Sequence, residues 1–75
     1  MEAELDYGQK AVGFTFNPSG DPDVQKVKEL YAEIINICND LKIAVGPGEK
    51  ARLLSVAITE AQTAQMWAVK GITFK

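Results

Sequence analysis

Arg52, Ser55 and Thr59 are the residues of this 75-residue chain whose types and spacing best suit ligand binding. They recur at i, i+3 and i+7, which places a guanidinium and two hydroxyls on one face near the start of an expected helix. A planar guanidinium close to a positive helix terminus suits a phosphate group. The same spacing also describes a solvent-facing stripe with incidental hydroxyls, and the sequence leaves both interpretations open.

Two lysines and two phenylalanines complete the set of candidate ligand-binding residues. Lys26 and Lys28 fall in an expected first helix, where they are either surface charges or phosphate contacts. Phe14 and Phe16 precede that helix. Aromatic side chains in such positions either pack into a core or interface, or stack on a base.

Catalytic groups are the next class to consider, and the sequence argues against them. The chain has no histidine to act as a general base near neutral pH. Its single cysteine, Cys38, falls in an apolar helical seam, where a free thiol is typically a small buried hydrophobe. Glu29 and Glu33 are four residues apart, as on a solvated helix face, and Gly46–Gly48 lacks the length and hydroxyl of a phosphate-binding loop. We expect no enzyme, no metal site and no cofactor.

Size and charge limit the possible partners. One small domain without a disulfide pair or a Cys/His zinc set needs other support for its core, which favours assembly with further subunits. A net charge of -2 and a pI near 4.9 argue against binding duplex DNA or RNA. The short apolar runs and the acidic start predict no membrane span and no signal peptide, and a lone thiol fits the cytoplasm.

Two helices are expected to position the candidate residues. The first covers residues 21–42, with Asp21 as N-cap and Pro22 at the first helical position. Its apolar residues alternate by three and four, as in packed antiparallel helices. These residues are Val24, Val27, Tyr31, Ile34, Cys38 and Leu41, with Leu30, Ile35 and Ile37 widening the apolar surface.

A turn at Gly46–Gly48 leads into a second helix over residues 47–70, which we expect Gly71 to close. The predicted seam of this helix consists of small residues with one leucine: Leu54, Ala57, Ala61, Ala64 and Ala68. Both helices carry apolar residues on more than one side. Because a two-helix hairpin buries only one face of each helix, this excess predicts a closed homo-oligomer.

The N-terminal 20 residues are predicted to form a separate arm. Val12, Phe14 and Phe16 alternate as in a short strand, which the Asn17–Gly20 cluster would end. An isolated strand has no partner in this chain, so we expect an extended arm that lies over helices, either of its own subunit or of a neighbouring one. The predicted organisation is all-α: an extended arm at residues 1–20 and an antiparallel helical hairpin at residues 21–75, assembled into a homo-oligomeric bundle.

The stretch Arg52–Lys70 resembles the second helix of a known phage family. It reads Arg, two residues, Ser, one residue, Ala, one residue, Thr, and then an Ala- and Met-rich apolar stretch ending in a basic residue. Val27-Lys28 resembles the aliphatic–lysine pair of the family's first helix. The family is that of the helical-hairpin cyclic-nucleotide sponges, the anti-CBASS and anti-Thoeris inhibitors, and the resemblance covers about residues 14–70.

The resemblance implies a homo-oligomer, often a hexamer, that captures bacterial signalling nucleotides in the host cytoplasm without cleaving them. A cyclic di- or trinucleotide, or a cyclic ADP-ribose isomer, would bind between protomers. By the same resemblance, Lys28 would contact phosphate, Arg52 and Thr59 would line a second pocket, and Phe14 or Phe16 would stack on a base. The family is expected to have a tyrosine there, so any contact made by its hydroxyl is missing.

Two other functions remain open at the level of sequence. An oligomeric structural or adaptor protein would bind another protein through the apolar helical surface. A nucleotide hydrolase would release a linear product, whereas a sponge returns its ligand intact.

Overall fold

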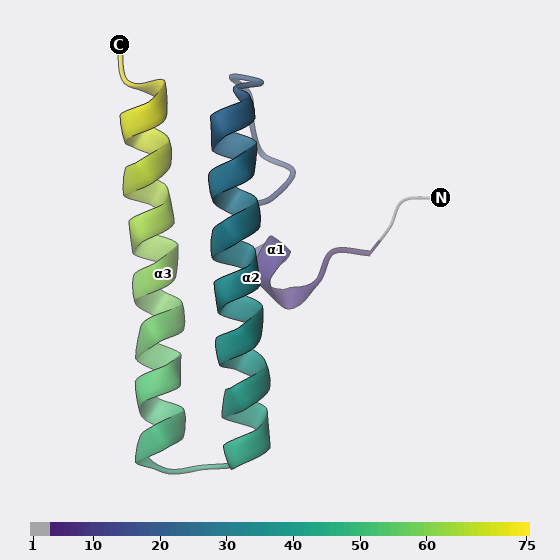
Figure 1. Cartoon of the computed structure of the whole chain (residues 1–75), viewed down its shortest axis with the longest axis vertical. Coiled ribbons are helices and arrows are strands. Elements are labelled where there is room, and N and C mark those ends of the chain that lie inside the picture. The colour runs from purple at the N-terminus through teal and green to yellow at the C-terminus, as the bar shows by residue number, and fades with distance from the viewer. Residues whose placement is uncertain (1–3) are drawn as a thin grey trace.

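The chain forms a flat helical hairpin with a short helix packed against it. In the computed structural model, which describes residues 4–75, these elements are α1 (Tyr7–Ala11), α2 (Pro22–Val45) and α3 (Glu49–Thr73). Helices α2 and α3 run antiparallel and side by side (Figure 1), within principal extents of 42 × 33 × 12 Å. No strand occurs in residues 4–75, so the predicted all-α hairpin is confirmed.

Helix α2 begins as the sequence predicts but ends later. The Asp21 carboxylate accepts a hydrogen bond of 2.8 Å from the Asp23 backbone N–H, and Pro22 occupies the first turn. The helix continues to Val45 rather than residue 42, because nothing interrupts it before Gly46, whose φ is 73°. Gly48 has a φ of 144°, which side chains disfavour, and α3 therefore begins at Glu49 instead of Pro47.

Gly71 does not end α3, contrary to the prediction. The φ angle of Gly71 is not positive, so this residue lacks the left-handed conformation of a helix-terminating glycine. The helix runs on to Thr73, whose hydroxyl donates a hydrogen bond of 2.8 Å to the Val69 carbonyl. The chain becomes extended only at Phe74, with φ −63° and ψ 135°.

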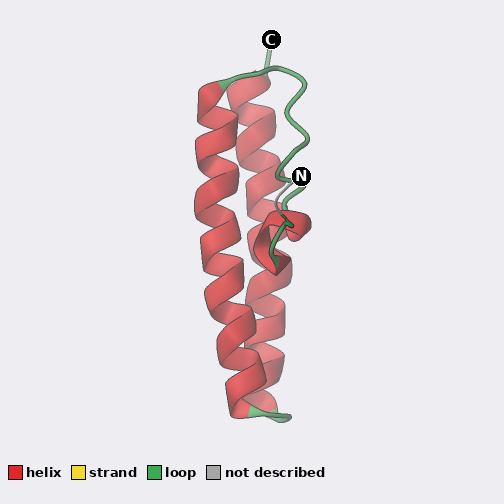
Figure 2. Ribbon diagram, turned by 90° about the vertical axis from the view of Figure 1, so that its right-hand side faces the viewer, coloured by secondary structure: helices red, strands yellow, loops and turns green. Residues whose placement is uncertain are grey.

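The predicted strand-like arm is wrong for the segment around α1. Asp6 and Gln9 form a capping box: the Asp6 carboxylate accepts from the Gln9 N–H at 2.8 Å, and the Gln9 side chain accepts from the Asp6 N–H at 3.0 Å. Residues 12–15 form turns rather than a strand. The part of the arm around α1 lies along its own α2 (Figure 2), where the Gly8 N–H donates to Asn36 Oδ1 at 2.7 Å. Residues 1–3 of the predicted arm lie outside the described residues.

The core joins the arm to both long helices. Its buried apolar residues are Val12, Ala32, Ile35 and Ile58. The predicted seam of α2 is only partly right, since Val24 is buried whereas Ile34 and Leu41 are each 49% exposed. The arm and α3 both pack on α2, and this shifts its buried face toward Ala32 and Ile35.

The predicted small-residue seam of α3 is also rotated. Ala57 and Ala64 are exposed, whereas Leu54, Ala61 and Ala68 are half-buried. The two fully buried residues of the helix are Ile58 and Gln65, which extend the three–four alternation through Ala61. The stripe through Ile58, Ala61 and Gln65 is therefore the one that meets α2 and the arm.

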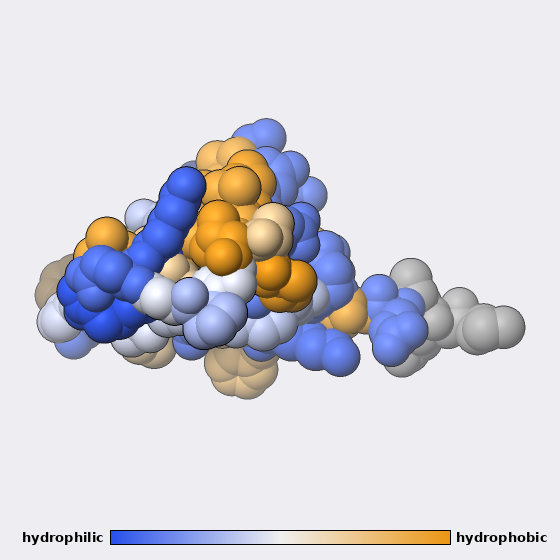
Figure 3. Space-filling model, turned by 90° about the horizontal axis from the view of Figure 1, so that it is seen from below, coloured by the Kyte–Doolittle hydropathy of each residue, from blue (hydrophilic) through white to orange (hydrophobic). Residues whose placement is uncertain are grey.

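A large apolar surface remains outside this core. On α2 the exposed residues include Leu30, Ile34, Ile37 and Leu41, and on α3 they include Leu53, Val56, Met66 and Trp67. Seen from the turn end, hydrophobic residues gather on the surface of the hairpin (Figure 3). Patches of this kind mark association surfaces. No helix in residues 4–75 is both long and apolar enough to cross a bilayer.

Candidate ligand-binding site

Lys28 is a buried lysine, only 4% exposed, on the face of α2 that the arm covers. Its ammonium donates hydrogen bonds to the carbonyl oxygens of Gly13, at 2.9 Å, and of Phe16. It also lies 5.7 Å from the centroid of the Phe16 ring. Burial lowers the pKa of Lys28. Interpreting Lys28 as a surface charge is therefore wrong, whereas Lys26, two residues earlier, is exposed.

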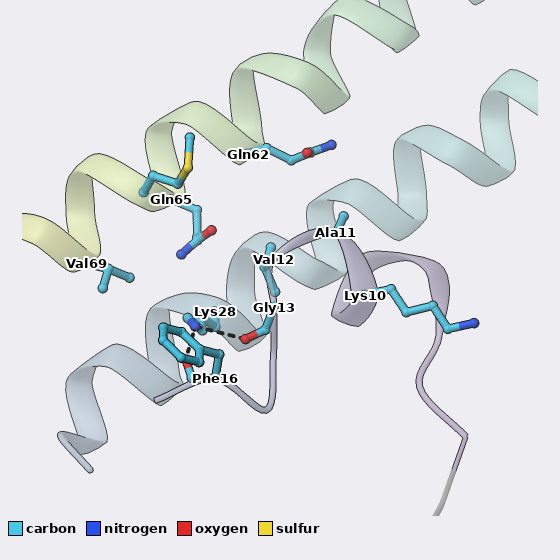
Figure 4. Close-up of a pocket in the computed structure, with 10 residues that line it drawn as sticks. Lys10, Ala11, Val12, Gly13, Phe16, Lys28, Gln62, Gln65 and Val69 are labelled. Atoms are coloured by element: carbon cyan, nitrogen blue, oxygen red, sulfur yellow. Dashed lines mark hydrogen bonds between the residues drawn. The ribbon is translucent and has the colours of Figure 1, made fainter. Parts of the chain in front are cut away.

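A hollow of about 510 Å³ opens between the arm and α3, with Lys28 on its α2 side (Figure 4). It is lined by Lys10, Ala11, Val12, Gly13, Phe16, Lys28, Gln62, Gln65, Met66 and Val69. Gln65 points toward Lys28 and Phe16, whereas the Lys10 ammonium points away (Figure 4). A volume in this range, with mostly apolar walls and few polar groups, is typical of small-molecule sites.

The two phenylalanines of the arm take different positions. Phe16 lines the hollow and is 71% exposed, which leaves most of its ring available to a ligand. Phe14 is half-buried, packs against the core and lines a smaller cavity of about 180 Å³ beside Glu29 and Glu33. Of the two stacking candidates, only Phe16 shares the hollow with Lys28.

Arg52, Ser55 and Thr59 lie near the start of α3 and do not line the hollow. The Arg52 guanidinium makes a bidentate pair with Glu49, with Nε–Oε1 and Nη2–Oε2 distances of 2.8 and 2.6 Å. This pair lowers the pKa of the Glu49 carboxyl. Ser55 donates to the Ala51 carbonyl at 3.0 Å, and Thr59 is exposed. Within one protomer, the hollow therefore brings together only two of the predicted residues, Lys28 and Phe16. Three others lie apart from them near the start of α3, and Lys26 and Phe14 belong to neither group.

Gln62 and Gln65 were not among the predicted site residues. They lie three residues apart on α3 and form part of the wall that faces the arm. The signal for Gln65 was present in the sequence: a long amide continues the alternation Leu54, Ile58, Ala61, where an apolar residue is expected. A polar residue in a buried seam marks either a hydrogen-bonded network or a site.

Comparisons with known proteins agree with this architecture. A family model described as Acb2/Tad1, hairpin domain, matches residues 8–73, which include α2, α3 and most of α1. No curated protein and no solved structure matches the chain. The match begins at the glycine where α1 touches α2 and ends with the last residue of α3. The chain therefore belongs to the Acb2/Tad1 hairpin family, the family of anti-CBASS and anti-Thoeris sponges.

Proposed function

We propose that this chain is a phage anti-defence protein that captures cyclic oligonucleotide or cyclic ADP-ribose signals and holds them uncleaved. The observation that carries the proposal is the family match over residues 8–73, since that family implies a cyclic-nucleotide sponge role. By binding the messenger in the cytoplasm of the infected bacterium, the protein keeps the CBASS or Thoeris effector inactive.

The hollow beside Lys28 supports this function on chemical grounds. A cyclic nucleotide combines anionic phosphates with flat, largely apolar bases. The hollow offers a buried ammonium, the exposed face of Phe16 and apolar walls from Val12 and Val69. An ammonium in such a setting acts strongly on an anion, because little water screens it. Lys28 exchanges one of its carbonyl partners for a phosphate oxygen when the ligand enters.

Assembly is the second part of the proposal. The apolar stripe Leu30, Ile34, Ile37 and Leu41 on α2 is 49–59% exposed in a single protomer. A homo-oligomer, often a hexamer in this family, would cover such a stripe and bring sites of neighbouring protomers together. Arg52 and Thr59 then belong to a second pocket between subunits, separate from the hollow.

The available side chains favour sequestration over hydrolysis. The chain contains no histidine, and in residues 4–75 no three metal-binding side chains come together. Histidine bases and metal-bound water are common means of phosphate-ester hydrolysis, so we expect the ligand to be recovered intact.

The decisive experiment is calorimetric titration of the sized oligomer with cyclic di- and trinucleotides and cyclic ADP-ribose isomers, followed by denaturation and chromatography of the bound ligand. Tight binding with intact ligand supports a sponge, and a linear product identifies a hydrolase. An oligomer that binds nothing on the panel points to the adaptor function.

The Arg52→Ala variant tests the second pocket. It should keep the assembly and weaken the binding of one class of ligand only, whereas full affinity for every ligand contradicts the second pocket.

A further inference from the structure

Of the two buried polar side chains that line the hollow, Lys28 is hydrogen-bonded and Gln65 is not, within the described residues. Gln65 is 5% exposed, yet within residues 4–75 its amide makes no hydrogen bond. No side-chain nitrogen or oxygen in that range is both fully occluded and unpaired, so the amide stays reachable through the hollow. Figure 4 shows it aimed toward Lys28 and Phe16.

A purely structural role explains this residue poorly. The walls of the hollow around Gln65 include the apolar Val12, Met66 and Val69. The Lys28 ammonium, toward which the amide is aimed, already donates to the carbonyls of Gly13 and Phe16. Burying an amide among apolar side chains without a partner is unfavourable, and a leucine of similar length would fill the same space without that cost. A ligand that occupies the hollow and pairs with the amide removes the penalty.

The chemistry of the amide narrows the class of ligand group. It presents an N–H donor and a carbonyl acceptor side by side in one plane. A phosphate offers only acceptors, so it would pair with the N–H donors of the amide and leave the amide carbonyl without a donor. The positive Lys28 suits a phosphate better. A flat ring with a donor next to an acceptor on one edge satisfies both amide atoms. The adenine edge formed by N6–H and N7 is the known bidentate partner of glutamine.

We propose that Gln65 is the base-reading residue of the hollow, pairing its amide with the N6/N7 edge of an adenine. This inference rests on the proposed function, because the adenine is that of the captured cyclic nucleotide. Met66 and Val69, on the same wall of α3, supply apolar contact for the ring. Gln65 thereby separates adenine-containing signals from those whose bases lack that edge.

The first test combines a protein change with a single-atom ligand change. Cyclic di-AMP, adenine-containing cyclic trinucleotides and cyclic ADP-ribose identify the ligand that the parent binds, and its 7-deaza analogue then removes the N7 acceptor. The parent should bind the analogue about three- to tenfold more weakly. Gln65→Leu should lose about ten- to hundredfold in affinity for the adenine ligand and show no further loss with the analogue. Gln25→Leu, on α2 and outside the hollow, is the control and should behave as the parent does.

The inference is overturned if Gln65→Leu keeps the affinity of the parent or remains sensitive to the 7-deaza change. Circular dichroism melting provides the folding control, since Gln65→Leu should melt no lower than the parent. If the parent binds none of the adenine ligands, the proposed capture of adenine messengers fails on its own. The Gln65 amide is then followed by NMR with adenosine monophosphate: a shift that 7-deaza-adenosine monophosphate does not produce supports the reading of adenine, and no shift overturns it.

Discussion

The Lys28 ammonium donates a hydrogen bond of 2.9 Å to the carbonyl oxygen of Gly13, fifteen positions earlier in the chain. The same ammonium also bonds the carbonyl of Phe16. One side chain of α2 thus holds both ends of the segment 13–16, and the residues at those ends, Gly13 and Phe16, both line the hollow. The docking of the arm and the shape of the candidate site therefore depend on the same group.

Replacing Lys28 by methionine should loosen the arm. The change keeps much of the apolar stem and removes both hydrogen bonds, so we expect a loss of about 1–3 kcal/mol in the free energy of unfolding. Amide hydrogen exchange in residues 13–16 should accelerate more than exchange in the middle of α3. Lys26→Met, a change of an exposed lysine, is the matched control and should alter neither quantity. Unchanged protection of residues 13–16 would contradict the anchoring role.

The stability contributed by Lys28 should depend on pH in a defined direction. Burial lowers its pKa from the ordinary 10.5, so between the lowered value and 10.5 the unfolded chain binds more protons at this group. The contribution of Lys28 to the free energy of unfolding therefore rises with pH across that window and reaches its full value above it. A neutral amine still has two N–H donors for the two carbonyls. Denaturant unfolding at about pH 7 and about pH 10 measures the difference in free energy of unfolding between the parent and Lys28→Met, and we expect the parent's advantage to be larger at the higher pH. A smaller advantage at the higher pH would contradict the burial effect.

Gly8 and Gly71 should respond in opposite ways to alanine. A Cβ at Gly8 would overlap the Ala32 carbonyl oxygen and lie 2.8 Å from Asn36 Oδ1, whereas a Cβ at Gly71 meets nothing within 4 Å. Gly8→Ala should cost about 1–3 kcal/mol by forcing α1 away from α2. Gly71→Ala should gain about 0.5–1 kcal/mol, as alanine is the better helix former. Thermal unfolding at fixed protein concentration measures both, and equal shifts would refute the close packing of α1.

A charge in the exposed stripe of α2 should break the proposed assembly. Ile37 is 59% exposed in one protomer, where a lysine would be tolerated, but an oligomer interface would bury that lysine unpaired. We expect Ile37→Lys to run as a smaller species in light scattering while remaining helical. Asp40→Asn, with the same change of charge on an exposed residue, should keep the parent size. An unaltered mass for Ile37→Lys would exclude this stripe from the interface.

The hairpin was predictable because its signals are local. Asp21 and Pro22 mark the start of α2, and Gly46–Gly48 marks the turn, through backbone chemistry that needs no distant partner. The buried faces were harder to predict, because which apolar stripe is covered depends on where the arm docks. The docking of the arm depends in turn on Gly8 meeting Ala32, a contact between distant parts of the sequence.

The candidate site was predictable in part for a similar reason. Lys28 and Phe16 were identified as candidates, but the carbonyl contacts that join them depend on the turns of residues 12–15, which no residue pattern specified. Gln65 was missed because a glutamine in a helix ordinarily indicates a solvated face. Arg52, by contrast, was singled out for its charge, and in one protomer that charge is paired with Glu49.

The short turn at Gly46–Gly48 also has a consequence for the rate of folding. Only three residues separate α2 from α3, so the two helices can meet after closing a short loop. Helical folds of this simple topology form in microseconds to milliseconds, far faster than synthesis itself. For the proposed homo-oligomer, subunit assembly, which depends on protein concentration, is then the slower step on the way to a complete binding site.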